Sequence, residues 1–410
     1  MLKLRDYQVE LSNQCLEILK RLKIVYLIAE VRTGKTLTAL NTANLYGAKK
    51  VLFITKLKAI NSIQTDYDAL SPDYEIQIIN KESLHKVSDN DFDLLIVDEN
   101  HAVSSTYPKP NVSAKAIKKR FGNLPQIYLS GTPWIESMSQ VFHSFWISNF
   151  SPFRNYRNFY EWAREYTEPS FKHFGALQVK DYSKSRDELI TKKIEPYLVK
   201  FTQAEAGFST EIQEHVLYFN IPDKTKKIVS KLLRDLVVEG KTEVILGDSP
   251  AKLMSKVHQL ENGTCIMESG NSIILDTSKA EFIKEYFKGQ KIGIFYYFKK
   301  EWELLKQVFG DNLTDDLEEF NSTDKNIALQ QVSSSEGISL KAAESLVFMN
   351  FGYSGRHFTQ ARDRQTTIDR KENNVYFVFS KNSLSEKIYK AISKKKRYNE
   401  KMFKKDYHLK

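Results

Sequence analysis

The sequence has few cysteines, no long apolar run and no apolar N-terminus, and each absence excludes a class of protein. Only Cys15 and Cys265 occur among its 410 residues, so we exclude a disulfide framework and a cysteine-based zinc cluster. No run approaches the roughly 20 apolar residues that span a bilayer. The charged first ten residues do not resemble a secretory signal. We therefore expect a cytoplasmic protein without a membrane partner.

Acidic residues are outnumbered by basic ones. The chain holds 61 Lys and Arg against 51 Asp and Glu, which gives a net charge of +10. This excess favours a polyanionic partner such as nucleic acid, and it also suits an acidic protein surface. Seven basic residues gather near the C-terminus: Lys394, Lys395, Lys396, Arg397, Lys401, Lys404 and Lys405. A solvated helix end and a phosphate contact both explain this cluster.

The length and the composition indicate a globular protein of more than one domain. A chain of 410 residues with 41% hydrophobic and 27% charged residues is typical of two folded domains of roughly 100 to 200 residues each.

A phosphate-binding loop is predicted within Ile24–Thr38, where an apolar strand leads into an amphipathic helix. Backbone N–H groups at the start of a helix bind phosphates. The residues of this predicted nucleotide-binding loop are Arg32, Thr33, Gly34, Lys35 and Thr36. Gly34 lets the backbone approach, Lys35 reaches the terminal phosphates, and the Thr36 hydroxyl coordinates Mg²⁺. Ala29 replaces the glycine that usually opens the loop, so a basic helix start after a buried strand is the alternative.

A helix is predicted before this loop, because apolar residues recur at helical spacing between Val9 and Leu22. Gln8 precedes them. Its amide offers a donor and an acceptor together, which is the pairing needed to read the edge of an adenine. An ordinary surface position is the alternative for Gln8 alone, and its place upstream of the loop favours nucleotide binding.

Four apolar runs predict an open parallel sheet in the first half of the chain. They are Val51–Thr55, Ile76–Ile79, Leu94–Val97 and Ile127–Ser130. The third run ends in Asp98 and Glu99, and in such sheets ligands gather at the carboxyl ends of the strands. We expect Asp98 to hold Mg²⁺ through water and Glu99 to polarise the water that attacks the γ-phosphate. A helix N-cap is the alternative role of this pair.

These motifs stand in the order found in superfamily 2 helicases and translocases: Gln8, the loop, Asp98-Glu99-Asn100-His101 and Ser130-Gly131-Thr132. The sequence resembles the DExH group, and its spacing is similar to the Swi/Snf-related enzymes of bacteriophages, which places it in the host cytosol. The resemblance implies that His101, Ser130 and Thr132 link the nucleotide site to a bound strand. It also implies that Thr55 and Lys56 contact backbone phosphates. Asn100 replaces the usual alanine, and we expect little effect on hydrolysis.

Aromatic and basic residues alternate between Ser151 and Phe201. Such rings stack on bases, or they pack a small helical insertion with a basic outer face, which we favour for most of them. The lysine-rich stretch Asp223–Glu239 predicts a helix at the start of the next domain.

Four further runs predict a second doubly wound sheet. They are Lys291–Phe298, Ile327–Val332, Ser345–Asn350 and Val375–Phe379. Residues 336–340 and 360–364 resemble motifs five and six of the same superfamily. The resemblance implies coupling or nucleic-acid roles for Gly337 and Ser339, and catalytic roles for Gln360 and Arg364.

An arginine finger is expected from motif six, because charge on a transferring phosphoryl group is stabilised by an arginine from across a closed cleft. Thr367 occupies the position of the second arginine. The finger is therefore Arg364, Arg362 or Arg370. For Arg362 and Arg370, the alternative role is an ion pair with Asp363 or Asp369.

We predict two RecA-like doubly wound α/β domains in tandem, with residues 1–150 and 211–390 as the domains, 151–210 as a helical insertion and 391–410 as a basic tail. The predicted function is an ATP- and Mg²⁺-dependent DNA helicase or translocase acting on duplex, branched or single-stranded DNA. A nucleotide-switched nucleic-acid clamp and an RNA helicase are the alternatives. Replication or recombination proteins are further candidate partners.

Overall fold

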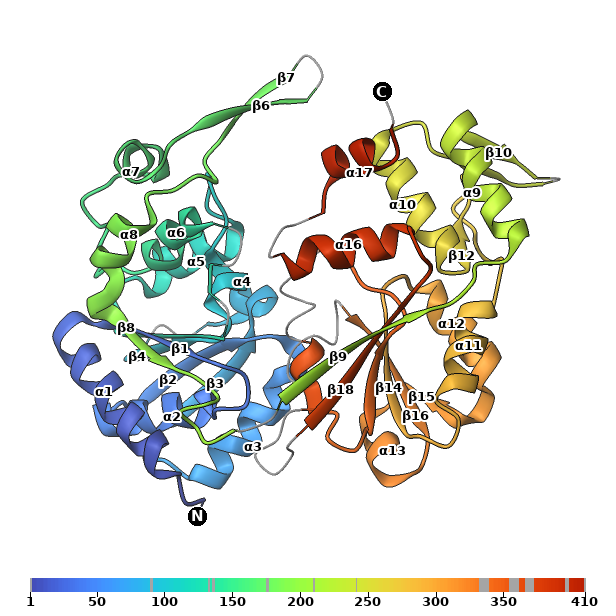
Figure 1. Ribbon diagram of the computed structural model, residues 1–410. Coiled ribbons are helices and arrows are strands. Elements are labelled where there is room, and N and C mark those ends of the chain that lie inside the picture. Colours follow the sequence, from blue (N-terminus) through green and yellow to red (C-terminus); the bar gives the residue numbers. More distant parts are fainter. Residues whose placement is uncertain are drawn as a thin grey trace. The chain divides into compact units, whose positions relative to one another are not determined.

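The chain folds into two units, Met1–Phe208 and Ser209–Lys410 (Figure 1). The computed structural model describes residues 2–88, 91–131, 133–134, 137–174, 177–208, 211–240, 242–331, 339–353, 361–365, 372–394 and 398–408. Each unit is built on a six-stranded parallel sheet. The predicted fold class, two doubly wound α/β domains in tandem, is confirmed.

The first unit contains eight strands and eight helices among its described residues. The strands are β1 (Ile24–Ala29), β2 (Lys50–Thr55), β3 (Glu75–Asn80), β4 (Leu94–Val97), β5 (Gln126–Ser130), β6 (Ser170–Phe174), β7 (Leu177–Asp181) and β8 (Leu198–Phe201). The helices are α1 (Asp6–Leu22), α2 (Lys35–Tyr46), α3 (Ile60–Leu70), α4 (Asn100–Ser104), α5 (Val112–Phe121), α6 (Val141–Trp146), α7 (Phe159–Tyr166) and α8 (Asp187–Ile194). The sheet order is β3-β2-β4-β5-β1-β8.

Both faces of the first sheet are buried, because the central strands β1 and β4 are apolar throughout, and β2 and β5 are apolar between their first and last residues. Along β1, Val25 and Leu27 pack on one side with α1, α2 and α3. Ile24 and Tyr26 pack on the other side with α5 to α8. This double burial explains why these strands appear in the sequence as continuous apolar runs.

Residues 151–210 were predicted as a helical insertion, and the described residues of this range form strands as well as helices. The strand β8 pairs with β1 from Tyr26↔Leu198 to Ala29↔Phe201 and extends the main sheet. The strands β6 and β7 form an antiparallel hairpin that projects as a ribbon in Figure 1. Most described rings of this segment pack inside the unit, since Phe153, Phe159 and Trp162 are fully buried.

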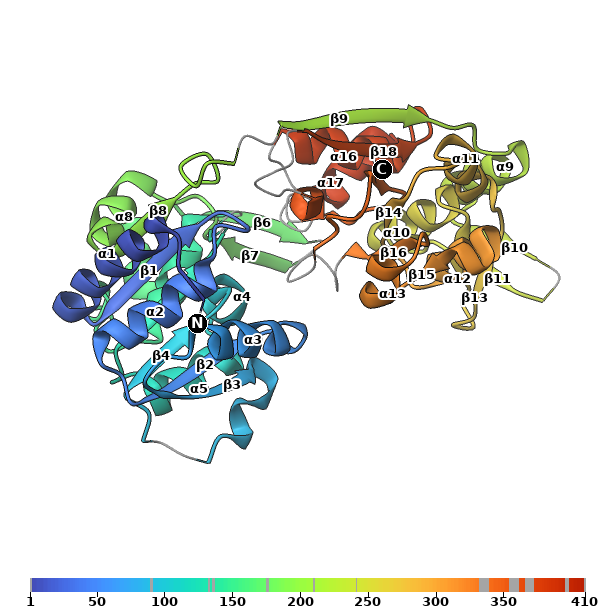
Figure 2. The ribbon, with the colours of Figure 1, turned by 90° about the horizontal axis from the view of Figure 1, so that it is seen from below.

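The second unit repeats the architecture. Its strands are β9 (Glu211–Tyr218), β10 (Val237–Glu239), β11 (Val244–Leu246), β12 (Thr264–Ile266), β13 (Ser272–Ile274), β14 (Ile292–Tyr296), β15 (Leu313–Thr314), β16 (Asn326–Gln330), β17 (Ser345–Phe348) and β18 (Glu372–Phe379). Its described helices are α9 (Asp223–Asp235), α10 (Pro250–Glu261), α11 (Ser278–Tyr286), α12 (Lys300–Phe309), α13 (Leu317–Ser322), α16 (Leu384–Ser393) and α17 (Glu400–Asp406). The order of the main sheet is β15-β16-β14-β17-β18-β9, and Figure 2 shows β9 along its edge beside β18.

The C-terminal segment is part of the second core. Within the stretch predicted as a basic tail, Tyr398 and Phe403 are buried in the cluster that also holds Phe377 and Ile388. The predicted helix Asp223–Glu239 ends earlier, at Asp235, because Leu236 adopts φ +61° and the chain continues as β10.

Candidate nucleotide site

The predicted loop connects β1 to α2, and Gly34 is its N-cap. Gly34 has φ +81° and ψ +34°, the left-handed region that favours glycine. A Cβ atom added here would lie 2.0 Å from Gln8 Nε2. Gly34 is therefore required twice, by its backbone conformation and by the close approach of the Gln8 amide.

The side chain of Lys35 lies over the loop. Its Nζ donates to the Glu30 carbonyl at 3.2 Å, and a Cβ on Gly131 would lie 3.5 Å from the same nitrogen. The ammonium group is thus placed where β1 and β5 end. The Thr33 hydroxyl donates to the same Glu30 carbonyl at 2.8 Å and shapes the turn.

Gln8 lies in the first turn of α1 and is nearly fully buried. Its Oε1 accepts from the backbone N–H of Arg5 at 2.9 Å, which caps the helix. The amide is thereby held against Gly34, next to the loop. Reading of an adenine by this amide stays a prediction.

The residues that follow β8 support the loop from behind, and sequence reasoning did not find them. The N–H of Glu30 donates to the Phe201 carbonyl at 3.0 Å. Gln203 donates from its backbone to Glu30 Oε2 at 2.6 Å and from its side chain to the Val31 carbonyl at 2.9 Å. Gln203 lies about 170 residues beyond the loop, so only a strand prediction for β8 would have placed it here.

Asp98 and Glu99 follow β4 at the same edge of the sheet. Asp98 accepts the Thr55 hydroxyl at 2.9 Å and the N–H of Glu99 at 3.0 Å. Burial raises the pKa of Asp98 above its ordinary value, while the Thr55 hydrogen bond and the charge of Lys35 oppose that rise. Thr55 is itself buried, so its hydroxyl faces the acidic pair.

The oxygen atoms of Thr36 and Asp98 are suited to bind Mg²⁺. The Thr36 hydroxyl at the start of α2 and the Asp98 carboxylate supply the hard oxygen ligands that this ion prefers. A divalent cation would also offset the cost of an ionised Asp98 at a partly buried position.

Glu99 adopts a strained backbone conformation, with φ +46° and ψ +48°. Its Oε2 lies 3.1 Å from His101 Nδ1, and the same His101 nitrogen lies 2.7 Å from Ser130 Oγ. The structure thus brings together the acidic pair, His101 and Ser130, as their order in the sequence suggested. Thr132 lies outside the described residues.

In the second unit, Arg362 Nη1 pairs with Glu214 Oε1 of β9 at 2.7 Å, and Tyr389 donates to the other oxygen of Glu214 at 3.1 Å. Glu214 is therefore a described ion-pair partner of Arg362. The side chain of Asp363 lies outside the described part of the structure. Arg364 is 8% exposed. Its carbonyl accepts the N–H of Leu340, next to Ser339, at 2.9 Å. Gly337, Gln360, Arg370 and Asp369 lie outside the described residues.

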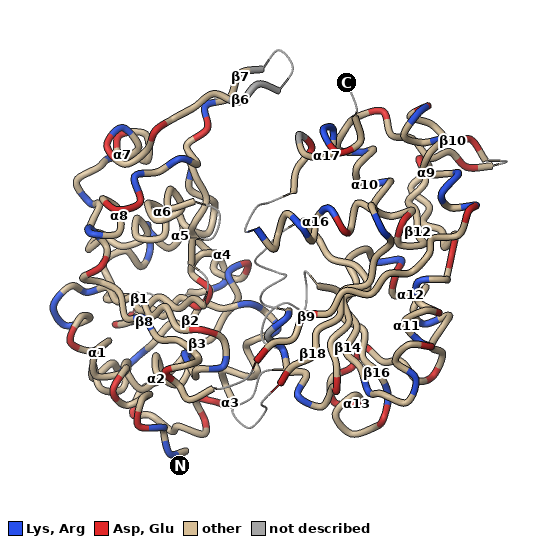
Figure 3. Tube along the Cα trace, viewed as in Figure 1, with Lys and Arg blue, Asp and Glu red and all other residues tan. Residues whose placement is uncertain are grey.

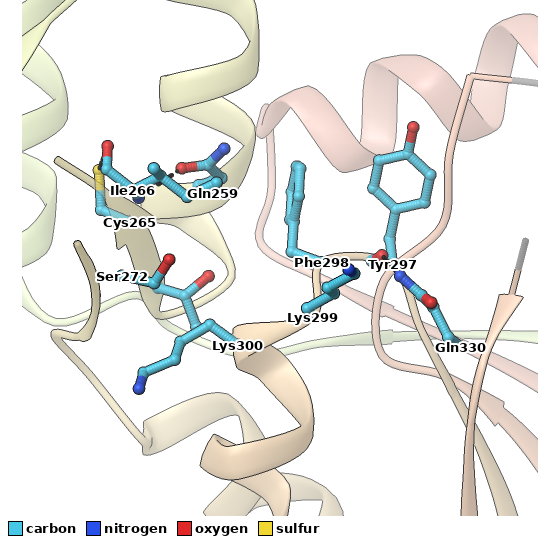
Figure 4. Close-up of a pocket in the computed structure, with 10 residues that line it drawn as sticks. Gln259, Cys265, Ile266, Ser272, Tyr297, Phe298, Lys299, Lys300 and Gln330 are labelled. Atoms are coloured by element: carbon cyan, nitrogen blue, oxygen red, sulfur yellow. Dashed lines mark hydrogen bonds between the residues drawn. The ribbon is translucent and has the colours of Figure 1, made fainter. Parts of the chain in front are cut away.

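A pocket of about 440 Å³ lies in the second unit, near the end of β14 (Figure 4). Tyr297, Phe298 and Lys300 form part of its wall. Its amides have structural partners: Gln259 accepts the N–H of Ile266 at 2.8 Å, and Gln330 donates to the Tyr297 carbonyl at 3.0 Å. We assign this pocket no part in the nucleotide site, whose described loop residues are in the first unit.

Basic and acidic residues are intermixed along both units (Figure 3).

Among the described residues, no helix is both long enough and apolar enough to cross a membrane.

The parallel sheet, the loop before α2 and the acidic pair after β4 define the first unit as an α/β protein of the phosphate-loop class. The chain belongs to the SNF2-related family, because the SNF2-related domain model matches residues 24–264, more than half of the sequence. Membership of this family supports ATP use, normally with Mg²⁺, and a nucleic-acid-dependent ATPase activity.

The chain is similar to two solved structures from Sulfolobus solfataricus. One is the SWI2/SNF2 ATPase core in complex with dsDNA, with 17% identity, a TM-score of 0.43 and coverage of 98% of this chain and 92% of that one. The other is the SWI2/SNF2 ATPase core domain, with 16% identity, a TM-score of 0.42 and coverage of 100% and 95%. A search of curated proteins gave no match.

Proposed function

We propose that this protein is an ATP-dependent DNA translocase or helicase of the DExH group of superfamily 2. The observation that carries the proposal is the meeting of Lys35, Asp98 and Glu99 at the carboxyl edge of one parallel sheet, in a chain that belongs to the SNF2-related family. The net charge of +10 supports a polyanionic partner.

The first unit supplies the groups that bind the nucleotide. The backbone N–H groups at the start of α2 and the ammonium of Lys35 hold the phosphates, and Gln8 contacts the base. Thr36 and Asp98 hold Mg²⁺, which when bound neutralises charge on the phosphate oxygens. Glu99 accepts a proton from the attacking water.

The second unit supplies an arginine that stabilises charge on the transferring phosphoryl group. Arg364 is our first candidate, with Arg362 and Arg370 as the others, and Gln360 contributes to the same motif. Nucleotide binding then favours closure of the two units, and hydrolysis favours their opening. Repetition of this cycle while both units hold DNA moves the protein along it.

Contacts to DNA are assigned to Lys56, Gly337 and Ser339. Thr55 was expected to contact backbone phosphates, but it is buried and donates its hydroxyl to Asp98, so it positions the acidic pair instead. His101, Ser130 and Thr132 transmit the state of the nucleotide to the DNA contacts. The biological setting that we infer is DNA recombination, repair or replication in a bacteriophage life cycle, in the host cytosol.

A nucleotide-switched clamp that remodels a nucleoprotein complex is the second candidate. It is favoured by Thr367, which stands at the position of the second arginine of motif six. A translocase shows ATPase activity strongly stimulated by polynucleotide, whereas a clamp shows slow turnover and nucleotide-dependent affinity.

The test compares Lys35→Ala and Glu99→Gln with the wild type, with the exposed Glu17→Gln as the control. ATPase activity is titrated with duplex DNA, single-stranded DNA and RNA at fixed salt, because phosphate contacts are salt-dependent. We expect Lys35→Ala to lose ATP binding. We expect Glu99→Gln to bind ATP within about threefold of the wild type and to lose at least about 100-fold in turnover, since general-base catalysis contributes roughly 10²- to 10⁴-fold. Turnover by Glu99→Gln at the wild-type rate would refute the role of Glu99, and stimulation by RNA alone would assign the substrate to RNA.

A further inference from the structure

Asn100 lies between Glu99 and His101 and is completely buried. Its amide Nδ2 donates to the Ser144 carbonyl of α6 at 3.1 Å. Its Oδ1 accepts the Ser104 hydroxyl at 2.6 Å. An alanine here would make neither bond, so Asn100 gives this chain a connection that the usual residue of the motif does not provide.

Ser144 joins two segments of the first unit. Its hydroxyl donates to the Gln140 carbonyl at 3.1 Å. It accepts the Trp134 indole N–H at 3.2 Å, and the Ser105 hydroxyl lies 2.6 Å away. One donor and two acceptor sites are all that a serine hydroxyl offers, so these three contacts saturate it. The chain just beyond Gly131, at Trp134, is thereby joined to α4.

The segment that carries Glu99 depends on such anchors. The helix α4 has only five residues, which is too short to be stable by itself. Glu99 precedes it in the left-handed region, a conformation that is unfavourable for a non-glycine residue. A strained residue of this kind persists only where its surroundings fix it. Asp98 fixes Glu99 on one side by accepting its N–H, and Asn100 fixes the chain on the other side.

We propose that Asn100 and Ser144 are positioning residues: they hold Glu99 in its strained conformation and connect its position to the segment at Trp134. This inference rests on the proposed ATPase function. Movement of the segment at Trp134 is transmitted through the Ser144 hydroxyl to α4 and then to Glu99. The strength of polynucleotide stimulation depends on this connection.

The variants that test it are Asn100→Ala, Ser144→Ala and their double. Ser144→Ala is the gentler change, because it leaves the carbonyl that accepts the Asn100 amide. Gln126→Ala is the matched control. Gln126 is also fully buried, and its amide donates to the Phe121 carbonyl at 2.9 Å. It begins β5, so it lies at the amino ends of the strands, away from Glu99.

We expect Asn100→Ala to lower the polynucleotide-stimulated kcat at least about tenfold, with the KM for ATP and the affinity for DNA within about threefold of the wild type. We expect Ser144→Ala to lower mainly the ratio of stimulated to basal turnover. The double variant should be no worse than Asn100→Ala, because residues of one network do not act additively. Gln126→Ala should lose thermal stability and keep its kcat.

The ratio of stimulated to basal turnover is the readout that a merely structural role would not move, because a loss of folded protein lowers both rates by the same factor.

The outcomes separate the two proposals. A wild type with stimulated ATPase activity, together with variants that keep the wild-type kcat or lose it only as Gln126→Ala does, overturns the positioning role alone. An unchanged ratio of stimulated to basal turnover in Ser144→Ala also overturns it. A wild type without ATPase activity overturns both the proposed function and this inference.

Discussion

The contact between Gly34 and Gln8 leads to a quantitative prediction. Replacing Gly34 with alanine places a residue with a Cβ at φ +81°, which costs roughly 1–2 kcal/mol. The new Cβ would also lie 2.0 Å from Gln8 Nε2, so the Gln8 amide must move. The displaced amide loses its bond to the Arg5 N–H, a loss of about 1 kcal/mol. The total cost is about 2–3 kcal/mol.

A double-mutant cycle isolates the steric part of this cost. Gln8→Ala alone removes the capping bond and costs about 1 kcal/mol. In that background Gly34→Ala meets no amide, so only the backbone term of roughly 1–2 kcal/mol remains. The two changes should therefore be less than additive, with a coupling free energy of about 1 kcal/mol.

The assay is urea unfolding of the four proteins of the cycle, together with titration of a fluorescent ATP analogue. Gly47→Ala is the control, because Gly47 has φ +80° and nothing within 4 Å of an added Cβ. It should cost the backbone term alone and show no coupling to Gln8→Ala. Equal costs for Gly34→Ala and Gly47→Ala, or a coupling below about 0.3 kcal/mol, would refute the reasoning.

Two further predictions concern the pH dependence and the support of the loop. Burial lowers the pKa of His143 from 6.5 to about 4, so between these values the unfolded chain binds the proton more tightly and stability falls as the pH falls. At pH 5 this loss is about 2 kcal/mol, and His143→Gln should reduce the drop in melting temperature between pH 7 and pH 5; an unchanged drop would contradict this cause. Gln203→Ala removes the side-chain bond to the Val31 carbonyl and should weaken ATP binding about three- to tenfold with little effect on DNA affinity, measured by nucleotide titration. Unchanged ATP affinity would show that the loop does not need this support.

The sequence predicts the central strands β2, β4 and β5 of the first sheet and its edge strand β3 to within one residue at each end, and it misses the edge strands β8 and β9. The strands β2, β4 and β5 are buried on both faces, so they appear as apolar runs, and their predicted bounds differ from the observed ones by at most one residue. The edge strand β9 has alternating, partly exposed residues, and β8 has only four residues. Their strand character depends on pairing with β18 and β1, which lie about 160 and 170 residues away in the sequence.

The same reasoning explains what was found of the site. The positions of Lys35, Asp98 and Glu99 can be predicted from the sequence, because residues that follow parallel strands lie at the same edge of the sheet. The roles of Gln203 and Ser144 cannot be predicted from the sequence, because a glutamine or a serine acquires such a role only from its tertiary contacts. Asn100 was expected to have little effect on hydrolysis, and its bond to Ser144 became visible only in the folded unit.

The support of the loop by β8 also has a mechanical consequence. The polypeptide runs from Phe201 through Gln203 to Phe208, where the first unit ends, and the bonds to Glu30 and Val31 attach the start of this connector to the loop. A tensile load on the connector is therefore borne first by the backbone beside Lys35. Stretching a single molecule by its ends would distort the loop between β1 and α2 before it tore the sheet apart.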